Sequence, residues 1–428
     1  MPSRLIQSVR GVRDLKPAEA SAWRHAEEVV RSILEGGGYR EFRVPVLEHA
    51  ELYRRSVGEQ TDIVQKEMYS LEGGKGQTLT LRPEATAGMV RAALEHGLHR
   101  GRHRFWCAGP MFRRERPQRG RLRQFHQFDA EAIGYAGPDI DAELIALAAR
   151  IFRALGVDGL VLEINSLGGA QCRRSYRQNL RAYFQDHFES LDADSRVRLD
   201  ANPLRILDSR NPQMSELIAG APDIAEFLEP ESARHLSGLE SLLASIGLPY
   251  RRNPKLVRGL DYYSRTVFEF LTDRLGAQNA VCAGGRYDGL VEQLGGPPTP
   301  AIGWAMGIER LMELASASPP PERTRVYLVL LGGLAVQQAG LQLAERLRSE
   351  CALLDLEMHC GGGGARAQMR HASRSGARYA VIIGEQELAV GEAGLKDLRS
   401  EAGQQAIPLA ELPRVLRDRA DRTIPAHG

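Results

Sequence analysis

The stretch GPMFRRERPQRGRLRQFHQFDAEAIG, residues 109–134, decides the fold of this chain. Apolar runs over 104–112 and 123–133 enclose a polar connection, and this arrangement predicts two antiparallel strands joined by a long loop. The loop, Arg113–Arg123, holds six arginines and one acid in eleven positions. Six guanidinium groups repel one another unless solvent or an anion separates them, so the loop is expected to face phosphate groups or RNA.

Residues of this loop and its flanks combine the groups that an ATP site needs. Arg113 and Arg121 supply cations for phosphate oxygens. Glu115 supplies a carboxylate that accepts a hydrogen bond from an exocyclic amine, and Phe125 supplies a ring that stacks on a base. An isolated run of arginines would be explained more simply as a solvated basic surface. The flanking strands favour the nucleotide site.

Away from this stretch, short strands and helices are interleaved. Apolar residues recur with a period near that of a helix or of a strand, and glycines and prolines separate the runs. Strands are predicted over 42–47, 77–81, 160–165, 267–272, 280–283 and 301–302, and helices over 18–36, 85–96, 139–155 and from 307 onwards. The pattern from about 169 to 250 is mostly helical. We therefore predict an α+β domain whose mostly antiparallel sheet is interrupted by a helical insertion.

The segment Ser316–Glu322, SASPPPE, breaks every periodicity, and consecutive prolines hold a chain extended. We place a linker over 316–323, between a first domain of residues 1–320 and a second of residues 324–428. In the second domain, strand-like runs alternate with helical runs over 326–331, 335–350, 354–359, 365–375 and 379–383. That alternation predicts a small α/β domain.

The composition is that of a globular protein without a membrane span. Of 428 residues, 43% are hydrophobic and 26% charged, and no run approaches the roughly 18 apolar residues that a membrane helix needs. The first residues lack the apolar segment of a secretory signal, so a cytoplasmic location is expected. A net charge of +2 neither requires nor excludes a nucleic-acid partner. Five cysteines lie far apart without zinc-site spacing, and we expect them to be reduced.

Several blocks of the sequence resemble the class II aminoacyl-tRNA synthetases. ERPQRGRLRQFHQ, residues 115–127, resembles their motif 2 in the form found in histidyl-tRNA synthetases. AIGWAMGIERL (301–311) resembles motif 3, with Arg310 in the position of its invariant arginine, and Pro45 would be the proline of motif 1. Further blocks that resemble the same family are RSVGEQTDIVQKEMYSL (55–71), TLTLRPEAT (78–86), LVRGLDYYSRTVFEF (256–270) and GGRYDGL (284–290).

The resemblance implies that ATP is a substrate. The residues it implies are Arg113 at the α-phosphate, Arg121 at the γ-phosphate, Glu115 at the adenine amino group, and Phe125 and Arg310 on the faces of the adenine ring. Arg258 would place a second fixed cation beside the α-phosphate, where charge builds when the carboxylate of histidine attacks. Mg²⁺ is expected too, bound mostly by ATP oxygens and water, and the sequence identifies no protein carboxylate as its ligand.

The resemblance also implies a pocket for histidine. A buried polar group without a partner costs free energy, so such a pocket needs a partner for each polar group of the substrate. The residues implied for the α-ammonium group are Glu84, Thr86 and Gln127. Those implied for the imidazole are Glu131 and Tyr263, with Tyr262 and Tyr287 shaping the pocket. Without the resemblance, one acid on a strand and a pair of tyrosines would be interpreted as structural.

Contacts with histidine tRNA are implied as well. Arg116, Gln118 and Arg119, at the loop tip, would contact the acceptor end and its extra guanosine. The domain 324–428 resembles an anticodon-binding domain, and a structural or dimerising role is the alternative. Its Gly364–Ala367 run lacks a hydroxyl that is common in the family, so anticodon affinity is expected to differ. We expect the insertion to contact the acceptor arm and the chain to form a homodimer through motif 1.

Two other functions fit part of the sequence. A histidyl-tRNA-synthetase-like regulatory subunit of ATP phosphoribosyltransferase would bind histidine without charging tRNA. Such relatives are expected to lack the C-terminal domain and active-site residues, whereas this chain keeps Arg113, Glu131, Arg258 and Arg310. A pure RNA-binding module would explain the arginines but has no use for motif 3. We therefore expect a ligase that activates histidine with ATP and transfers it to the 3′ end of its tRNA.

Overall fold

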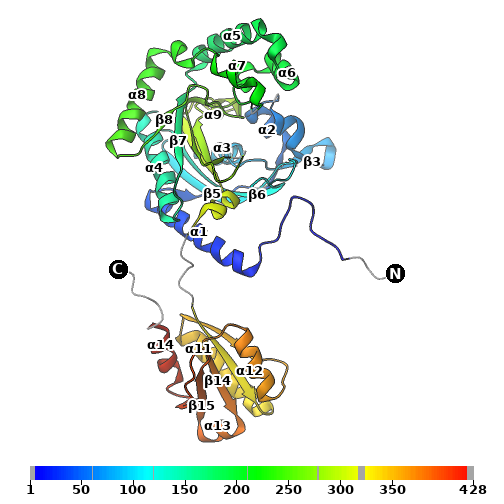
Figure 1. The fold of residues 1–428 in the computed structure, drawn as a ribbon, viewed down its shortest axis with the longest axis vertical. Coiled ribbons are helices and arrows are strands. Elements are labelled where there is room, and N and C mark those ends of the chain that lie inside the picture. Colours follow the sequence, from blue (N-terminus) through cyan, green and yellow to red (C-terminus); the bar gives the residue numbers. More distant parts are fainter. Residues whose placement is uncertain are drawn as a thin grey trace. The chain divides into compact units, whose positions relative to one another are not determined.

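The structure is a computed structural model that describes residues 5–59, 61–118, 120–209, 211–276, 279–316 and 323–421. The chain divides into two compact units, Met1–Ser318 and Pro319–Gly428 (Figure 1). Each unit has hydrophobic clusters of its own. The predicted linker over 316–323 falls almost entirely outside the described residues. Within the described ranges, no helix combines the length and the apolar character needed to span a membrane.

An eight-stranded sheet forms the centre of the first unit. Its strands are β1 (Arg40–Glu41), β5 (His103–Phe112), β6 (Gln124–Ile133), β7 (Val161–Ser166), β8 (Arg251–Arg252), β9 (Ser264–Leu271), β10 (Ala280–Arg286) and β11 (Ala301–Gly307). Their order is β1-β5-β6-β11-β10-β9-β7-β8. The two edge pairs, β1 with β5 and β7 with β8, are parallel, and the pairs between them are antiparallel. The prediction of a mostly antiparallel sheet is confirmed.

Helices and a smaller sheet surround this centre (Figure 1). The helices outside the insertion are α1 (Pro17–Gly36), α2 (Ala50–Val57), α3 (Thr86–Glu95), α4 (Pro138–Ala154), α9 (Leu290–Gln293) and α10 (Ile308–Leu314). The smaller antiparallel sheet consists of β2 (Leu47–His49), β3 (Tyr69–Glu72) and β4 (Thr78–Leu81), in the order β2-β4-β3.

The side chains of β6 point alternately to the hydrophobic core and to the opposite face of the sheet, which we call the functional face. Phe128, Ala130 and Ala132 are fully buried in a cluster that also contains apolar side chains of α1, α4 and α8. Successive strand residues point to opposite faces, so Gln127 and Glu131 point to the other face. The sheet therefore has one face covered by helices and one face on which polar groups are gathered.

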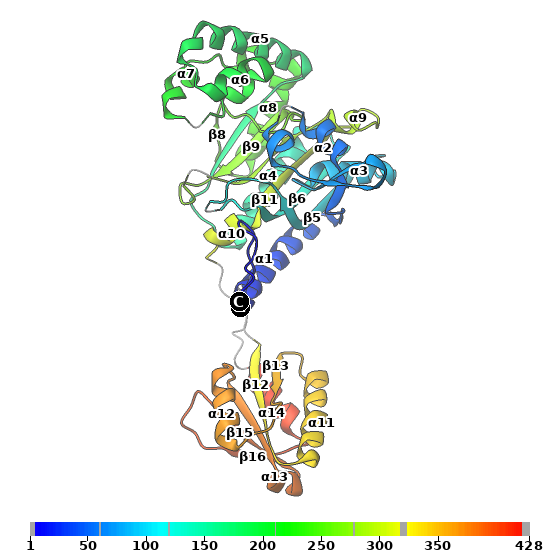
Figure 2. The same ribbon diagram turned by 90° about the vertical axis from the view of Figure 1, so that its right-hand side faces the viewer.

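A helical insertion separates β7 from β8 and β9. It contains α5 (Ala170–Asp186), α6 (Ala193–Ala201), a 3₁₀ turn (Pro203–Ile206), α7 (Ser215–Ala219) and α8 (Pro230–Ser245). In Figure 2, α5, α6 and α7 gather at one end of the first unit. Their buried apolar residues, such as Tyr176, Leu180 and Phe184, join the cluster that also contains the buried tyrosines of the sheet's functional face. The insertion is therefore packed onto the catalytic unit rather than separate from it.

The predicted strand over 42–47 is wrong. The structure has β1 before it and β2 at its end, and residues 42–45 belong to neither strand. Pro45 has no backbone N–H to donate to a ladder, and the Val44 carbonyl accepts a hydrogen bond of 2.9 Å from the Arg82 side chain. The backbone of this segment bonds to Trp106 and Arg82 at Phe42 and Val46, but these bonds do not continue as a ladder. The strand predicted at 301–302 is longer than expected and extends to Gly307.

The second unit has a five-stranded mixed sheet. Its strands are β12 (Thr324–Leu331), β13 (Leu354–Met358), β14 (Tyr379–Gly384), β15 (Glu392–Asp397) and β16 (Gln405–Pro408), and its helices are α11 (Leu334–Glu350), α12 (Ala365–Arg374), α13 (Glu385–Val390) and α14 (Leu412–Asp421). The order is β13-β12-β14-β15-β16. β12 is parallel to both neighbours, whereas β15 and β16 are antiparallel additions that the sequence pattern did not predict.

Candidate active site

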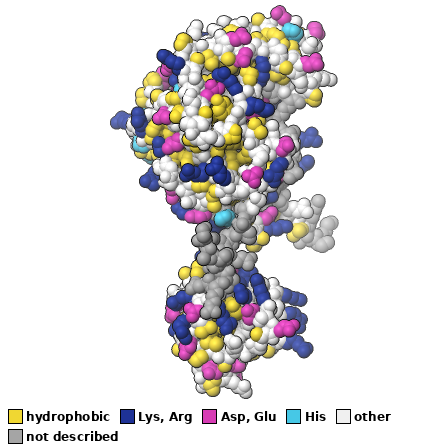
Figure 3. All heavy atoms as spheres, turned by 60° about the vertical axis from the view of Figure 1, so that its left-hand side comes forward, with side chains coloured by type: hydrophobic (Ala, Val, Ile, Leu, Met, Phe, Trp, Pro, Cys, Tyr) yellow, Lys and Arg dark blue, Asp and Glu magenta, His cyan; other side chains and the backbone are white. Residues whose placement is uncertain are grey.

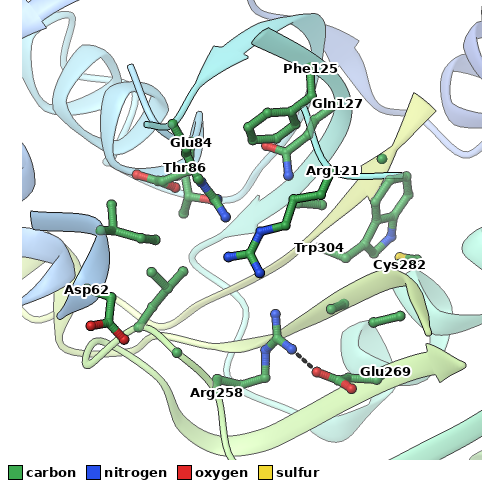
Figure 4. Close-up of a pocket in the computed structure, with 18 of the residues that line it drawn as sticks. Asp62, Glu84, Thr86, Arg121, Phe125, Gln127, Arg258, Glu269, Cys282 and Trp304 are labelled. Carbon is green, nitrogen blue, oxygen red and sulfur yellow. Dashed lines mark hydrogen bonds and ion pairs between the residues drawn. The ribbon is translucent and has the colours of Figure 1, made fainter. Parts of the chain in front are cut away.

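A cavity of about 460 Å³ lies on the functional face of the large sheet (Figure 4). Segments far apart in the sequence line it, including the arginine-rich loop, β6, β10, β11 and the start of α10. The predicted site residues among its lining are Glu84, Thr86, Arg113, Glu115, Arg121, Phe125, Gln127, Arg258, Tyr262, Tyr263, Tyr287 and Arg310. The fold therefore brings the predicted ATP and histidine residues into one cavity.

The arginine-rich loop is held as a hairpin by its own backbone. The Arg113 N–H donates to the Arg123 carbonyl at 2.9 Å. Gln118 and Arg121 exchange backbone hydrogen bonds of 3.0 and 2.9 Å. Because β5 and β6 are paired up to Phe112 and Gln124, the hairpin continues directly from the sheet. These bonds fix the backbone at Arg113 and Arg121 relative to the sheet.

Arg113 covers one face of the Phe125 ring. Its guanidinium carbon lies 5.1 Å from the ring centre, and its Nε donates to the Pro83 carbonyl at 2.9 Å. A guanidinium plane over an aromatic ring is a favourable contact, and the bond to Pro83 fixes its direction. Arg113 is thus positioned by two contacts before any substrate binds.

Arg121 lies between two carboxylates. It forms an ion pair with Glu115, and its Nη2 is 3.5 Å from Glu67 Oε1. Glu115 is 8% exposed, so this pairing is largely shielded from water. A polyphosphate that entered here would compete with these carboxylates for the guanidinium group.

Arg310 connects three parts of the cavity wall. From the first turn of α10, its Nε donates to the Gly120 carbonyl in the loop at 2.9 Å. Its Nη1 donates to the Ala280 carbonyl at the start of β10 at 2.6 Å. The neighbouring Glu309 accepts from the backbone N–H of His126 at 2.9 Å and lies 3.0 Å from its Nδ1. Motif 3 therefore holds both the loop and β6 in place.

Glu131 is a fully buried carboxyl group with both oxygens bonded. Thr86 Oγ1 donates to Oε1 at 2.6 Å, and the Tyr287 hydroxyl donates to Oε2. Burial raises the pKa of Glu131 well above its usual range, and these two hydrogen bonds oppose that effect. Glu131 does not itself line the cavity, but Gly303 does, and Gly303 lacks a side chain where Oε2 approaches. The carboxylate therefore stands just behind the cavity wall.

Glu84 and Gln127 each bring a buried acceptor to the cavity. Glu84 is 4% exposed, and its Oε1 accepts from the Ala87 N–H at 3.0 Å. Within the described part of the chain, Glu84 Oε2 and Gln127 Oε1 have no hydrogen-bond partner. Burial raises the pKa of Glu84. Buried acceptors without donors are costly, and a cationic group such as an α-ammonium would satisfy both.

Three tyrosines and Arg258 form a further part of the cavity wall. The rings of Tyr262 and Tyr263 lie 4.7 Å apart, and the Tyr287 ring meets Tyr262 edge-on at 5.7 Å. The Arg258 guanidinium carbon lies 5.7 Å from the centre of the Tyr263 ring. Arg258 also forms an ion pair with Glu269 of β9 (Figure 4). The wall is rigid and aromatic, with one cation directed into the cavity.

Of the residues predicted to contact tRNA, Arg116 and Gln118 do not line this cavity. Gln118 borders a second cavity of about 440 Å³, which is lined also by residues of α1 and α10 such as Trp23 and Met312. Arg116 lines neither cavity. Arg119 lies outside the described residues.

Asp129 is a titratable site residue that the sequence analysis missed. It follows Gln127 at strand spacing on β6 and is fully buried. The Cys107 thiol lies 3.8 Å from Asp129 Oδ2. Burial raises the pKa of Asp129 to about 8, and the negative charge of Glu84 adds to the effect. The two-residue period of a strand could have identified Asp129, because it assigns this residue to the same face as the predicted acceptors.

Further residues of the cavity come from segments that the sequence analysis did not assign to it. These are Asp62 and Glu67 before β3, and Arg198, Arg205 and Asp208 of the helical insertion. Asp62 lies 3.6 Å from the Arg198 guanidinium and 3.7 Å from that of Arg205. The insertion therefore contributes directly to the wall. No local sequence signal distinguishes these two arginines from the many exposed ones.

Comparisons with known proteins agree with this geometry. The profile of the family described as Histidyl-tRNA synthetase matches residues 11–311, and that of the Anticodon binding domain matches 325–419. A histidine–tRNA ligase of Halorhodospira halophila is 52% identical over 421 residues, which is 97% of this chain and 99% of that protein. One of Aromatoleum aromaticum is 52% identical over 419 residues, with 96% and 95% covered.

Solved structures show the same fold. The histidyl-tRNA synthetase of S. aureus superposes with a TM-score of 0.80 and 31% identity, covering 96% of this chain and all of that chain. A structure titled as an ATP phosphoribosyltransferase regulatory subunit/histidyl-tRNA synthetase from Bacillus halodurans reaches 0.64 at 21% identity, covering 89% and 99%. That similarity concerns the fold alone. On the family match and on relatives at 52% identity over nearly its whole length, this chain belongs to the histidyl-tRNA synthetase family, with an anticodon-binding domain at its C-terminal end.

Proposed function

We propose that this chain catalyses the histidine–tRNA ligase reaction. Histidine and ATP form histidyl-adenylate and pyrophosphate, and the histidyl group is then transferred to the 3′ end of histidine tRNA with release of AMP. One observation carries the proposal: a single cavity is lined both by several arginines and by two side chains, Glu84 and Gln127, that have a buried acceptor without a partner in the described part of the chain. The arginines suit a polyphosphate, and the acceptors suit the ammonium group of an amino acid. Family membership supports the same reaction.

Adenylate formation follows from where the cations lie. A carboxylate oxygen of histidine attacks the α-phosphorus, the bond to the pyrophosphate oxygen breaks, and negative charge develops on the phosphoryl oxygens. We assign Arg113 and Arg258 to that charge and Arg121 to the γ-phosphate. Glu115 would accept from the adenine amino group. Fixed cations that require no rearrangement lower the barrier most effectively, and the contacts of Arg113 and Arg258 provide that rigidity.

The adenine ring would lie against Phe125, whose second face is free of Arg113, and beside Arg310. Because Arg310 donates to two backbone carbonyls, its guanidinium plane is fixed. A flat cation over one face of the purine and an aromatic ring over the other is the arrangement that base stacking favours. No nucleophile of the protein is needed for the step.

Histidine would bind with its ammonium group at Glu84 and Gln127, close to Thr86. The imidazole would reach Glu131 where Gly303 opens the wall, with Tyr263 as a second partner and Tyr262 and Tyr287 around the ring. The two hydrogen bonds to Glu131 fix its oxygens and leave each with a further lone pair for a ring N–H. An analogue without those ring nitrogens could not donate this further hydrogen bond to the buried carboxyl group, which gives selectivity.

Mg²⁺ would be carried mainly by ATP. In the described part of the chain, no three His, Cys, Asp or Glu side chains are grouped so that they could hold a metal ion by themselves. The carboxylates nearest the phosphate end, Glu67 and Glu115, are both engaged by Arg121. When bound with ATP, the ion would neutralise phosphate charge, and one of these carboxylates could join it only after Arg121 moves to a phosphate.

We assign the tRNA to three parts of the chain. Arg116, Gln118 and Arg119 would meet the acceptor end, the insertion the acceptor arm, and the C-terminal unit the anticodon. Basic and acidic side chains are mixed over the face drawn in Figure 3, so recognition would depend on local clusters rather than on overall charge. We also propose a domain boundary within 316–323, a homodimer formed through motif 1, and a cytoplasmic location.

The test is histidine-dependent exchange of labelled pyrophosphate into ATP, followed by charging of histidine tRNA. Exchange reports adenylate formation alone, so it separates the first step from tRNA binding. We expect both activities, with no exchange when histidine is replaced by phenylalanine. A regulatory protein would bind histidine but show neither activity, and that result would refute the proposal.

A further inference from the structure

The helical insertion bonds directly to the segment Arg258–Tyr263, which carries one proposed catalytic cation and two tyrosines of the histidine pocket. Three of its side chains make these bonds: Arg205 Nη2 donates to the Gly259 carbonyl, Asn202 Nδ2 to Asp261 Oδ1 at 3.0 Å, and Arg173 Nη1 to the Tyr263 carbonyl at 2.5 Å. They come from α5, the residue after α6 and the following 3₁₀ turn. The segment is therefore held along its whole length.

These contacts differ in their exposure to solvent. Asn202 is 5% exposed, and its bond to Asp261 is partly buried, as is the bond from Arg173 to Tyr263. The Arg205 side chain is 12% exposed, although the Gly259 carbonyl that it reaches is exposed. Arg173 and Arg205 are cationic donors, and charge-assisted hydrogen bonds are stronger than neutral ones. An exposed arginine of α5, Arg181, pairs instead with Asp200 on the outer surface, where both side chains are more than half exposed.

The opposite side of the segment is closed by the end of α2. The Asp261 N–H donates to the Val57 carbonyl at 3.1 Å. Gly58 has φ +103°, and a Cβ atom there would overlap the Asp261 carboxylate. Asp261 is therefore clamped between the catalytic unit and Asn202, and the segment cannot shift toward either side without losing a bond.

The chain directly after the segment is also fixed by the insertion. Arg265 has φ +48°, the one non-glycine residue with a positive φ in the described ranges. Its N–H donates to the Gly168 carbonyl at 3.0 Å, and its side chain donates to Glu231 of α8 at 2.8 Å. A left-handed backbone conformation is unfavourable for a residue other than glycine, and it persists where the surrounding structure holds it. Four side chains of the insertion thus determine the path of residues 258–265.

We propose that Arg173, Asn202 and Arg205 are positioning residues for adenylate formation. They hold Arg258 where its guanidinium meets the α-phosphate and hold Tyr263 beside the imidazole. The inference rests on the proposed function, since it concerns the same reaction. It gives the insertion a part in the chemical step, in addition to contact with tRNA. Misplacing a catalytic group by about 1 Å lowers a rate by about a hundredfold, so small losses of support are measurable.

The test compares Asn202→Ala and Arg205→Met with Arg181→Met, a control that removes an exposed arginine of the same insertion. Pyrophosphate exchange without tRNA is measured over ranges of histidine and ATP, together with the thermal midpoint. We expect kcat for exchange to fall about ten- to a hundredfold in the first two variants and to be unchanged in the control. Arg205→Lys, which keeps a cation near the Gly259 carbonyl, should recover part of the loss.

A double-mutant cycle separates positioning from a general loss of stability. If Arg205 acts through Arg258, then Arg205→Met should lower kcat much less in an Arg258→Lys background than in the unmodified chain. Additive losses, or losses that follow the fraction of unfolded protein, would overturn the proposal. So would exchange kinetics equal to those of the unmodified chain. Absence of exchange in the unmodified chain would instead refute the proposed function.

Discussion

Gly303 on β11 is paired with Glu131 on β6, and a Cβ atom on Gly303 would overlap Glu131 Oε2. The same carboxyl group accepts from Thr86 and Tyr287, so any displacement of Glu131 breaks at least one buried hydrogen bond. A residue without a side chain is thus required by the Glu131 carboxylate, and the Ala130 carbonyl of β6, 2.7 Å from the same Cβ position, adds to the restriction.

Gly303→Ala should therefore raise the KM for histidine by about ten- to a hundredfold, with little change in the KM for ATP. The loss of a hydrogen bond to a buried carboxyl group is the physical reason. Steady-state pyrophosphate exchange measures both constants. Gly289→Ala is the matched control, because nothing lies within 4 Å of a Cβ atom placed there. Equal rises in both KM values would contradict the assignment of Glu131 to the histidine end.

Asp129→Asn should stabilise the protein increasingly as the pH rises. The pKa of Asp129 is about 8 in the folded chain and near 3.8 when exposed. Between these values the folded chain keeps a proton that the unfolded chain has lost, so folding stability falls as the pH rises through this window. Asparagine cannot ionise and escapes that loss. Thermal midpoints at about pH 5 and about pH 8.5 should show a larger gain at the higher pH.

The control for this prediction is Asp158→Asn, which changes an exposed acid in the same unit. Its effect on the midpoint should be small and nearly the same at both pH values. A gain from Asp129→Asn that was larger at low pH would show that the buried group is ionised in the folded chain.

Arg258→Met should leave histidine binding nearly intact and lower kcat for exchange by about a hundred- to a thousandfold. The cation acts on negative charge that builds up on the α-phosphoryl oxygens in the transition state. Glu269 would lose its partner, so the double variant Arg258→Met/Glu269→Gln is the control for an unpaired buried carboxylate. Calorimetric titration with histidine gives the affinity and exchange gives kcat. A loss of affinity as large as the loss of kcat would indicate ground-state binding.

Phe125→Leu should raise the KM for ATP by about tenfold while the KM for histidine stays constant. Leucine keeps the apolar contact but loses the ring that stacks on adenine. It also removes the ring whose centre lies 5.1 Å from the Arg113 guanidinium carbon, so kcat should fall modestly. Initial rates of exchange over a range of ATP concentrations measure the effect. An unchanged KM for ATP would place the adenine elsewhere.

Residues 1–318 alone should fold and catalyse pyrophosphate exchange but charge tRNA poorly. The two units have separate hydrophobic clusters, and the cavity is lined by the first unit alone. Circular dichroism checks the fold, and exchange and charging are measured in parallel. Charging at the rate of the full chain would show that the C-terminal unit adds no tRNA affinity.

Local pattern predicted much of the fold. The apolar runs around the arginine-rich loop became β5 and β6, and the helical periods became α1, α3 and α4. Prediction failed where pairing depends on distant partners. β1 and β8 have two residues each, and their place is set by β5 and β7 rather than by their own sequence. Residues 42–45 look like a strand, but they bond to the Trp106 backbone and the Arg82 side chain without forming a ladder.

The sequence by itself determined the family, the arginine-rich loop and the types of residue that line the cavity. These follow from motifs and short-range periods. Tertiary structure alone decided which groups meet. Thr86, Glu131 and Tyr287 are far apart in the chain but share one hydrogen-bonded cluster. The insertion residues Asn202 and Arg205 resemble ordinary surface residues in the sequence. Burial and bonding to residues dozens of positions away give them their role, and no local pattern encodes contacts of that range.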